Sequence, residues 1–148
     1  SRKISKAIIK IRKKTPIHRT KQLAEIICKA IPSNKQDIHP ATKTFQAFRI
    51  YINHELDEIR EVLPQATDVL CKGGRLAAIS FHSLEDRIVK RFMRDQSKPK
   101  DQPLELPVVQ DYRDIKLKLV GKKIRSSEDE VSKNQRARSA LLRVAERC

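Results

Sequence analysis

Apolar residues recur at helical spacing along the first part of the chain. Steps of three and four positions, with lysines between them, predict an amphipathic helix over about residues 2 to 13, set by Ile4, Ala7, Ile8 and Ile11. Pro16 follows it. A second helix is predicted from Thr20, which is suited to cap it, to just before Pro32, with the apolar stripe Leu23, Ile26, Ile27 and Ala30. Each helix should bury one face and leave the other to water.

The same spacing extends over a long segment that begins at Thr42, after the loop "PSNKQDIHP". Its apolar positions are Phe45, Phe48, Ile52, Leu56, Ile59, Leu63, Ala66 and Leu70. Pro64 lies inside this segment and lacks the amide hydrogen that a helix interior uses. We therefore expect Pro64 to break the helix and residues 65 to 71 to form a separate short helix.

The period changes after Gly73 and Gly74. Residues 76 to 79 are apolar without alternation, which predicts a strand over residues 75 to 81 that is covered on both faces in a parallel sheet. A helix is predicted next in "SLEDRIVKRFMR", with its core face formed by Leu84, Ile88 and Phe92. Beyond a linker, "KPKDQPLELP", the segments "DIKLKLV" and "SALLRVAE" alternate like strands, and "SSEDEVSKN" predicts a short helix capped by Ser127 with Glu130.

This order of elements predicts an α/β fold: a helical module, then the last part of a parallel sheet whose final strands pair antiparallel. A buried parallel strand needs parallel neighbours, and the other predicted strands of this chain do not supply them. We therefore expect the apolar edge from Leu76 to Phe81 to lie open and to promote self-association.

Composition adds a candidate partner. The chain has 33 Lys and Arg against 18 Asp and Glu, a net charge of +15, which favours encounters with a polyanion such as nucleic acid. A basic surface that is merely solvated is the alternative. No apolar run approaches the roughly 20 residues of a membrane span, and the first residues do not read as a secretory signal. We expect a cytoplasmic protein with no membrane partner.

Metal, disulfide and phosphate-loop sites are not indicated. Cys28, Cys71 and Cys148 are odd in number and form no paired motif, and the four histidines are too scattered to suggest a ligand set. The glycines form neither of the glycine-rich patterns that hold nucleotide phosphates.

The stretch "SFHSLEDRIVKRF", residues 80 to 92, is the strongest candidate for a site. Ser83 and Asp86 have the spacing of a helix-capping box, which explains part of it. Ser80 and His82 are left over, at the carboxyl end of the predicted buried strand, where open α/β sheets bind ligands. A histidine that only hydrogen-bonds a neighbouring loop is the alternative.

Four long motifs together resemble the bacterial ribosomal RNA small-subunit methyltransferase H family. They are "RTKQLAEII", "HPATKTFQAFRIYINHEL", "GGRLAAISFHSLEDRIVKRFMR" and "NQRARSALLRVAE", which lie between residues 19 and 146 in the family's order. The resemblance implies S-adenosylmethionine-dependent methylation of a cytidine N4 in 16S ribosomal RNA. It also implies a class I, Rossmann-like methyltransferase sheet interrupted by an inserted helical domain, with residues 1–40 as the end of the insert and 41–148 as the C-terminal part of the methyltransferase domain.

The resemblance also suggests roles for residues. His82, Ser80 and Ser83 are candidates to orient the cytosine amine, a poor nucleophile, or to help its proton leave. The candidates for contact with ribosomal RNA or the 30S subunit are Arg19, Lys21, Lys43, Arg49, Tyr51, Arg87, Arg91, Arg136 and Arg138. The family has Asn-Pro-Arg where this chain has Asn134, Gln135 and Arg136, and its glycine-rich cofactor loop lies upstream of the residues matched here.

Two other functions remain open. A non-enzymatic RNA- or ribosome-binding module would explain the net charge and the missing cofactor loop. A helix-turn-helix DNA-binding protein would use "HRTKQLAEIICKAIP" as its recognition helix, but the proline-containing gap before it fits that motif less well.

The 148-residue chain should not bind S-adenosylmethionine measurably, because it has no glycine-rich turn between a strand and a helix. Calorimetric titration of this chain, run beside a full-length family member, measures this. Saturable binding by the chain at micromolar cofactor would show that the cofactor site is misplaced.

Overall fold

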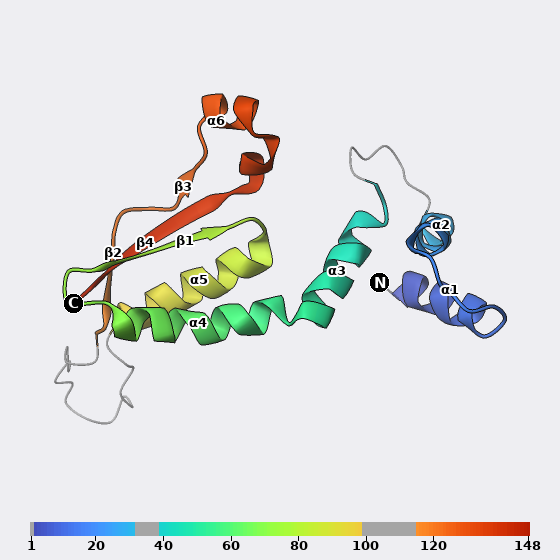
Figure 1. Cartoon of the computed structure of the whole chain (residues 1–148), viewed down its shortest axis with the longest axis horizontal. Helices are drawn as coiled ribbons and strands as arrows, with labels where there is room; N and C mark the ends of the chain where they lie inside the picture. The colour runs from blue at the N-terminus through green and yellow to red at the C-terminus, as the bar shows by residue number, and fades with distance from the viewer. Residues whose placement is uncertain (1, 32–38, 99–114) are drawn as a thin grey trace, which may run out of the picture. The chain divides into compact units, whose positions relative to one another are not determined.

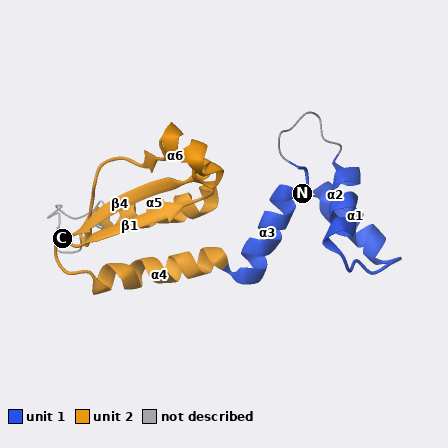
Figure 2. Cartoon of the chain, turned by 45° about the horizontal axis from the view of Figure 1, so that its top comes forward, with its two compact units in different colours: residues 1–54 blue, residues 55–148 orange. Residues whose placement is uncertain are grey.

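The computed structural model describes residues 2–31, 39–98 and 115–148 (Figure 1). The chain divides into two compact units, residues 1–54 and 55–148 (Figure 2). The sequence placed a domain boundary near residue 40, whereas the compact units divide after His54. Most of the predicted loop after Ile31 and nearly all of the predicted linker after Ser97 lie outside the described residues. No helix in the described part of the chain is long and apolar enough to cross a bilayer.

The first unit contains α1 (Arg2–Arg12), α2 (Thr20–Ala30) and α3 (Thr42–Asn53). The helices α1 and α2 pack against each other, and α2 buries Ile26 and Ile27. Both helices therefore form where their apolar stripes predict them. The predicted cap is wrong: Thr20 is already the first helical residue, and Arg19 occupies the cap position without a side-chain cap bond.

The long helical segment is interrupted at His54, and the predicted break at Pro64 is wrong. His54 has a left-handed backbone, with φ 53°, and α4 then runs without interruption over Glu55–Val69 with Pro64 inside it. Histidine is among the residues that adopt this conformation more readily. Pro64 is exposed, so water can satisfy the carbonyl group one turn earlier that loses its helical donor.

The second unit carries a small antiparallel sheet. Its strands are β1 (Arg75–Ser80), β2 (Leu117–Leu119), β3 (Ile124–Arg125) and β4 (Leu141–Arg147). The order is β1-β4-β2, and β3 pairs with the start of β4. In the β1–β4 pair, Arg75 lies opposite Glu146 and Ser80 opposite Leu141. The prediction that the last strands pair antiparallel is confirmed.

The predicted two-sided cover of β1 is not found among the described residues. Burial alternates along the strand: Ser80 is 2% exposed, whereas Ile79, on the other face, is 61% exposed. Within residues 39–98 and 115–148, β1 pairs only with β4, so its second edge has no strand partner there. The structure is α/β, while the Rossmann-like parallel sheet stays a prediction.

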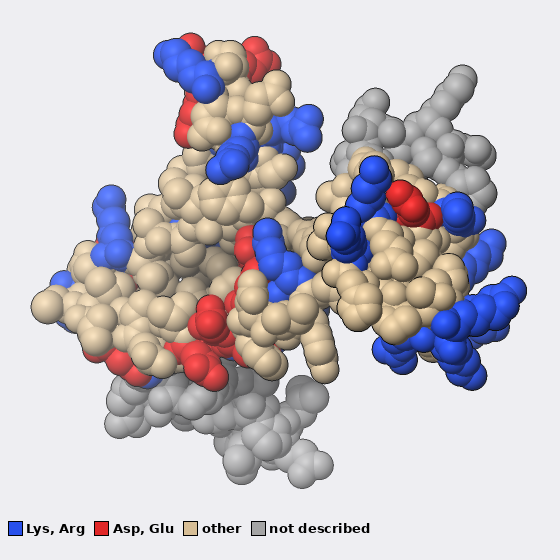
Figure 3. Space-filling model, turned by 45° about the vertical axis from the view of Figure 1, so that its right-hand side comes forward, with Lys and Arg blue, Asp and Glu red and all other residues tan. Residues whose placement is uncertain are grey.

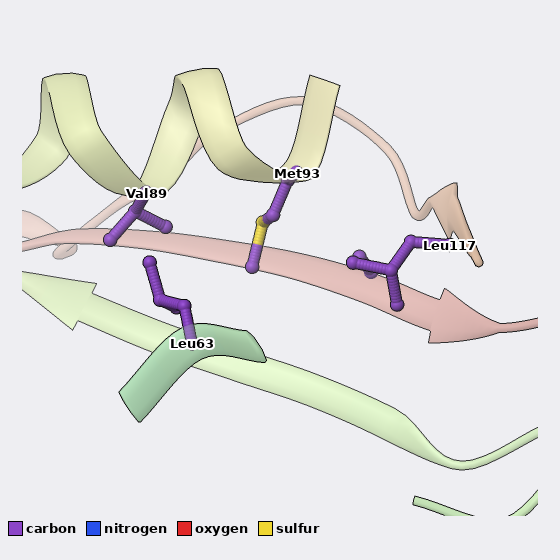
Figure 4. Close-up of a cluster of buried hydrophobic side chains, with 5 residues drawn as sticks. Leu63, Val89, Met93 and Leu117 are labelled. Atoms are coloured by element: carbon purple, nitrogen blue, oxygen red, sulfur yellow. The ribbon is translucent and has the colours of Figure 1, made fainter. Parts of the chain in front are cut away.

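The core of this unit lies between the sheet and two helices, α4 and α5 (Ser83–Gln96). Figure 4 shows four of its five buried residues by label, and the full cluster is Leu63, Val89, Met93, Leu117 and Ala145. The predicted inward face of α5 is partly wrong. Leu84 is 41% exposed and Ile88 and Phe92 pack only at the edge of the cluster, because the sheet covers the neighbouring face of the helix, which carries Val89 and Met93.

The last helix is α6 (Glu128–Lys133), followed by a 3₁₀ turn over Gln135–Ser139. The Ser127 hydroxyl accepts a hydrogen bond from the Glu130 amide at 3.2 Å. The predicted cap at Ser127 is confirmed.

Replacing Met93 by alanine should lower the free energy of unfolding by about 2–5 kcal/mol, because it opens a cavity where the side chain is 1% exposed. Leu84→Ala on the same helix is the matched control and should cost less than about 1 kcal/mol. Urea denaturation followed by circular dichroism measures both. Equal losses would show that α5 is seated on a different face.

Candidate functional site

The end of β1 and the start of α5 bring together the three residues proposed for chemistry. Ser80 is the last residue of β1 and is buried, His82 precedes α5 in an extended conformation, and Ser83 is the exposed first residue of the helix. Of the three side chains, only that of Ser83 lies open to solvent.

The helix cap at this point differs from the predicted one. His82 is the N-cap of α5: its Nδ1 accepts a hydrogen bond from the Glu85 amide at 3.4 Å. The Glu85 carboxylate reaches back, and its Oε2 accepts from the amides of Phe81 at 2.8 Å and His82 at 3.3 Å. The predicted Ser83–Asp86 capping box is wrong, because Ser83 is already helical and the extended residue before it fills the cap position.

The cap determines the proton position on the His82 ring. Because Nδ1 accepts a hydrogen bond, the neutral ring carries its proton on Nε2. That atom is fully buried and lies 3.2 Å from Oε1 of Glu85, although the alignment is too poor for a good hydrogen bond. One ring nitrogen thus serves the helix cap and the other is buried.

Glu55, the first residue of α4, completes the cluster. One side-chain ligand atom from each of Glu55, His82 and Glu85 lies within 4.8 Å of the others, and all three residues are half-buried. Two carboxylates and an imidazole suit a divalent cation in type. A proton on Nε2 opposes metal binding at that atom, so we interpret the cluster as an imidazole beside two carboxylates and not as a metal site.

A second ion pair holds α5 on the sheet. The Arg143 guanidinium, from β4, donates two hydrogen bonds to the Asp86 carboxylate, at 2.7 Å and 3.1 Å. Both side chains are mostly buried, 18% and 16% exposed. The hydrogen bond from Arg143, with its charge and those of Lys123 and Lys90, holds the pKa of Asp86 below its usual range, against the opposing effect of partial burial.

Sequence reasoning missed Glu55 and Arg143. Arg143 carried a signal in the sequence, since an arginine between the apolar residues of a strand, at a position that faces the core, needs a partner for its charge. Glu55 carried none, because its approach to His82 depends on how α4 packs.

The residues proposed for RNA contact, eight cations and Tyr51, fall in three places. Arg87 and Arg91 line a groove between α4 and α5, and Arg136 and Arg138 are exposed on the 3₁₀ turn. The remaining five, which are exposed residues of the first unit, are Arg19, Lys21, Lys43, Arg49 and Tyr51. Tyr51 is 79% exposed, and its ring lies 6.5 Å from that of His54. Figure 3 shows Lys and Arg side chains spread over the drawn face.

Asp86→Asn should lower the free energy of unfolding at pH 7 by about 1–3 kcal/mol, because Arg143 loses its charged partner. The folded-state pKa of Asp86 is depressed, so its contribution is full above about pH 4 to 5 and is lost as the pH falls through the lower folded value. Urea titrations at several pH values should therefore show the difference between the variant and the parent shrinking below about pH 4. Asp129→Asn, at an exposed pair with Lys133, is the control and should change little. A difference that does not depend on pH would contradict the assignment.

Comparison with known proteins gives one family and many relatives. The model of the MraW methylase family matches residues 1–148. Proteins named ribosomal RNA small subunit methyltransferase H are 54% identical in Nitrosococcus oceani and 55% in Alteromonas mediterranea, in each case over 99% of this chain and 47% of the relative. The relative from Coxiella burnetii is 52% identical over 99% of this chain and 48% of its own length. The chain thus spans about half the length of these curated relatives.

Proposed function

Because the chain belongs to the MraW methylase family, we propose that it forms part of an S-adenosylmethionine-dependent methyltransferase that modifies N4 of a cytidine in small-subunit ribosomal RNA. The observation that carries the proposal is identity above 50% over 99% of the chain to proteins named ribosomal RNA small subunit methyltransferase H. The aligned part includes the strand end and helix start where the candidate site lies.

S-adenosylmethionine supplies the methyl group on a sulfonium when it is bound. The described strand end does not fit this cofactor by itself, because β1 leads to α5 through Phe81 and His82, with no glycine to let a nucleoside approach the backbone. We therefore assign the cofactor to other residues of the full-length protein, and the target nucleotide to the end of β1.

The cluster of Glu55, His82 and Glu85 contains more polar groups than a helix cap requires. A cap needs one acceptor atom, which Asn or Ser supplies with a smaller side chain. Here one ligand atom of the imidazole and one of each of two half-buried carboxylates lie within 4.8 Å of one another, next in sequence to the exposed Ser83. In this proposal Ser83 hydrogen-bonds the cytosine, a carboxylate accepts the proton that leaves the amine, and His82 positions the carboxylates.

A non-enzymatic RNA-binding module is the second candidate, which the net charge of +15 favours. The DNA-binding alternative is weakened by the structure. Residues 13 to 19 separate α1 from α2, which is a longer connection than the turn of a helix-turn-helix motif.

The function is tested with a full-length protein that carries this chain, 30S subunits from cells that lack the modification, and S-adenosylmethionine. Nuclease digestion and mass spectrometry should find N4-methylcytidine at a single position. No methyl incorporation, with RNA binding retained, would favour the non-enzymatic module.

Substitutions at His82 separate capping from chemistry. His82→Ala should destabilise the protein by about 1 kcal/mol, whereas His82→Asn should restore the cap and the stability. If the imidazole positions the carboxylates, His82→Asn should still lower the rate of methyl transfer by about 10²-fold and shift its pH profile. Thermal denaturation and single-turnover methylation measure the two effects. Full activity of the Asn variant would show that His82 caps the helix and has no role in methyl transfer.

A further inference from the structure

A groove between α4 and α5 lies next to the candidate site. It has a volume of about 380 Å³, and its lining combines apolar side chains with arginines, among them Leu56, Leu84, Phe92, Arg60, Arg87 and Arg91. All of these residues belong to the second compact unit. The volume is within the range of pockets that hold small molecules or single nucleotides.

Two residues that line the groove are direct sequence neighbours of residues of the candidate site. Leu56 directly follows Glu55 on α4, and Leu84 lies between Ser83 and Glu85 on α5. Arg91 and Phe92 lie about two helical turns further along α5, roughly 10–12 Å away. A chain that occupies the groove would therefore pass from the start of α5 along both helices.

Two of the arginines have no protein partner in the described residues. Arg60 pairs with Asp57 at 2.6 Å, and Arg94, outside the groove, pairs with Asp95 at 2.7 Å. Arg87 and Arg91 are exposed, and within residues 39–98 and 115–148 neither makes an ion pair or side-chain hydrogen bond. They lie one helical turn apart, which places their Cβ atoms about 5–6 Å from each other. The groove is therefore positively charged along the α5 rim.

An apolar floor beside free guanidinium groups suits one class of ligand. Guanidinium groups bind phosphate bidentately, and apolar or aromatic side chains stack on unpaired bases. Leu84 is 41% exposed and Phe92 is half-buried, so both have surface left for such contact. A duplex would present phosphates but no free base faces to the floor.

We propose that the α4–α5 groove binds single-stranded RNA that flanks the target cytidine, with Arg87 and Arg91 on phosphates and Leu84 and Phe92 beneath a base. This inference rests on the proposed function for the identity of the RNA. The positive charge of the groove rim favours a polyanion as the ligand. The apolar floor favours a polyanion with unpaired bases, which is single-stranded nucleic acid.

The test uses this chain, a fluorescent single-stranded RNA of about ten nucleotides, and anisotropy at several salt concentrations. Arg87→Ala with Arg91→Ala should reduce the slope of log K against log salt by about 1.4, and the affinity at 0.1 M salt by about 20-fold. Lys90→Ala with Arg94→Ala is the matched control: it removes the same charge from the same helix at the same spacing, outside the groove. Circular dichroism checks that both variants fold.

The apolar floor has its own variant. Leu84→Ala should weaken binding of single-stranded RNA several-fold without changing the salt slope, and should not alter binding of a duplex of equal length. An unchanged slope in the double arginine variant, or an equal loss in the control, would overturn the proposal. Competition by polyglutamate as strong as that by RNA would also overturn it, because the groove would then bind any polyanion. So would a double arginine variant that loses a homodimer in sedimentation but still binds RNA, because the groove would then be a contact between copies of the chain.

Methylation by a full-length protein separates this inference from the proposed function. If the enzyme is active and the double arginine variant raises KM for RNA with kcat retained, both stand. If the enzyme is active and the variant binds and reacts like the parent, only the groove assignment fails. If no methyl group is transferred but the variant loses RNA affinity, the enzymatic proposal fails while the groove remains an RNA site.

Discussion

The antiparallel pairing of β1 with β4 is the constraint on which the rest of the second unit depends. Six residue pairs, from Arg75–Glu146 to Ser80–Leu141, join segments that are far apart in the sequence. Directly opposite residues share a face, so Ala78 and Arg143 both lie on the side of α5. A slip of one residue would turn Arg143 away from Asp86 and move the buried apolar set to the open face.

The ion pair between Asp86 and Arg143 fixes the position of α5 on the sheet, because the register of β4 determines where Arg143 lies. It joins the first turn of the helix to the strand through two hydrogen bonds from mostly buried groups. The capping box of His82 and Glu85 is formed in the same helical turn and ties the end of β1 to the helix. The candidate site is thus held from two sides, by a long-range ion pair and by a local cap, which suits a site that must keep side chains in fixed positions.

The same local feature has two consequences for function. The cap fixes the His82 tautomer and buries its Nε2, which removes the ring as a solvent-exposed base. The ring also lies beside carboxylates from α4 and α5, with one ligand atom of each residue within 4.8 Å of the others, and in the proposed reaction these carboxylates are the proton acceptors. The groove between α4 and α5 lies next to this cluster. The packing of these two helices against each other therefore determines both the proposed site and the groove.

The sequence by itself determined the elements whose signal is local. Helical stripes predicted α1, α2 and α5, alternation predicted β2 and β4, and the Ser127 cap followed from residue type and spacing. The residues at the end of β1 were proposed as a site in the same way, because they follow an apolar run that leads into a helix, and their role stays a prediction. The tertiary structure decided the features for which the local pattern allows more than one outcome. The helix broke at His54 instead of Pro64, since an exposed proline keeps a solvated carbonyl while packing of α4 keeps the helix whole. His82 rather than Ser83 became the cap, and Glu55 and Arg143 joined the site, because those contacts depend on distances between segments that no local pattern records.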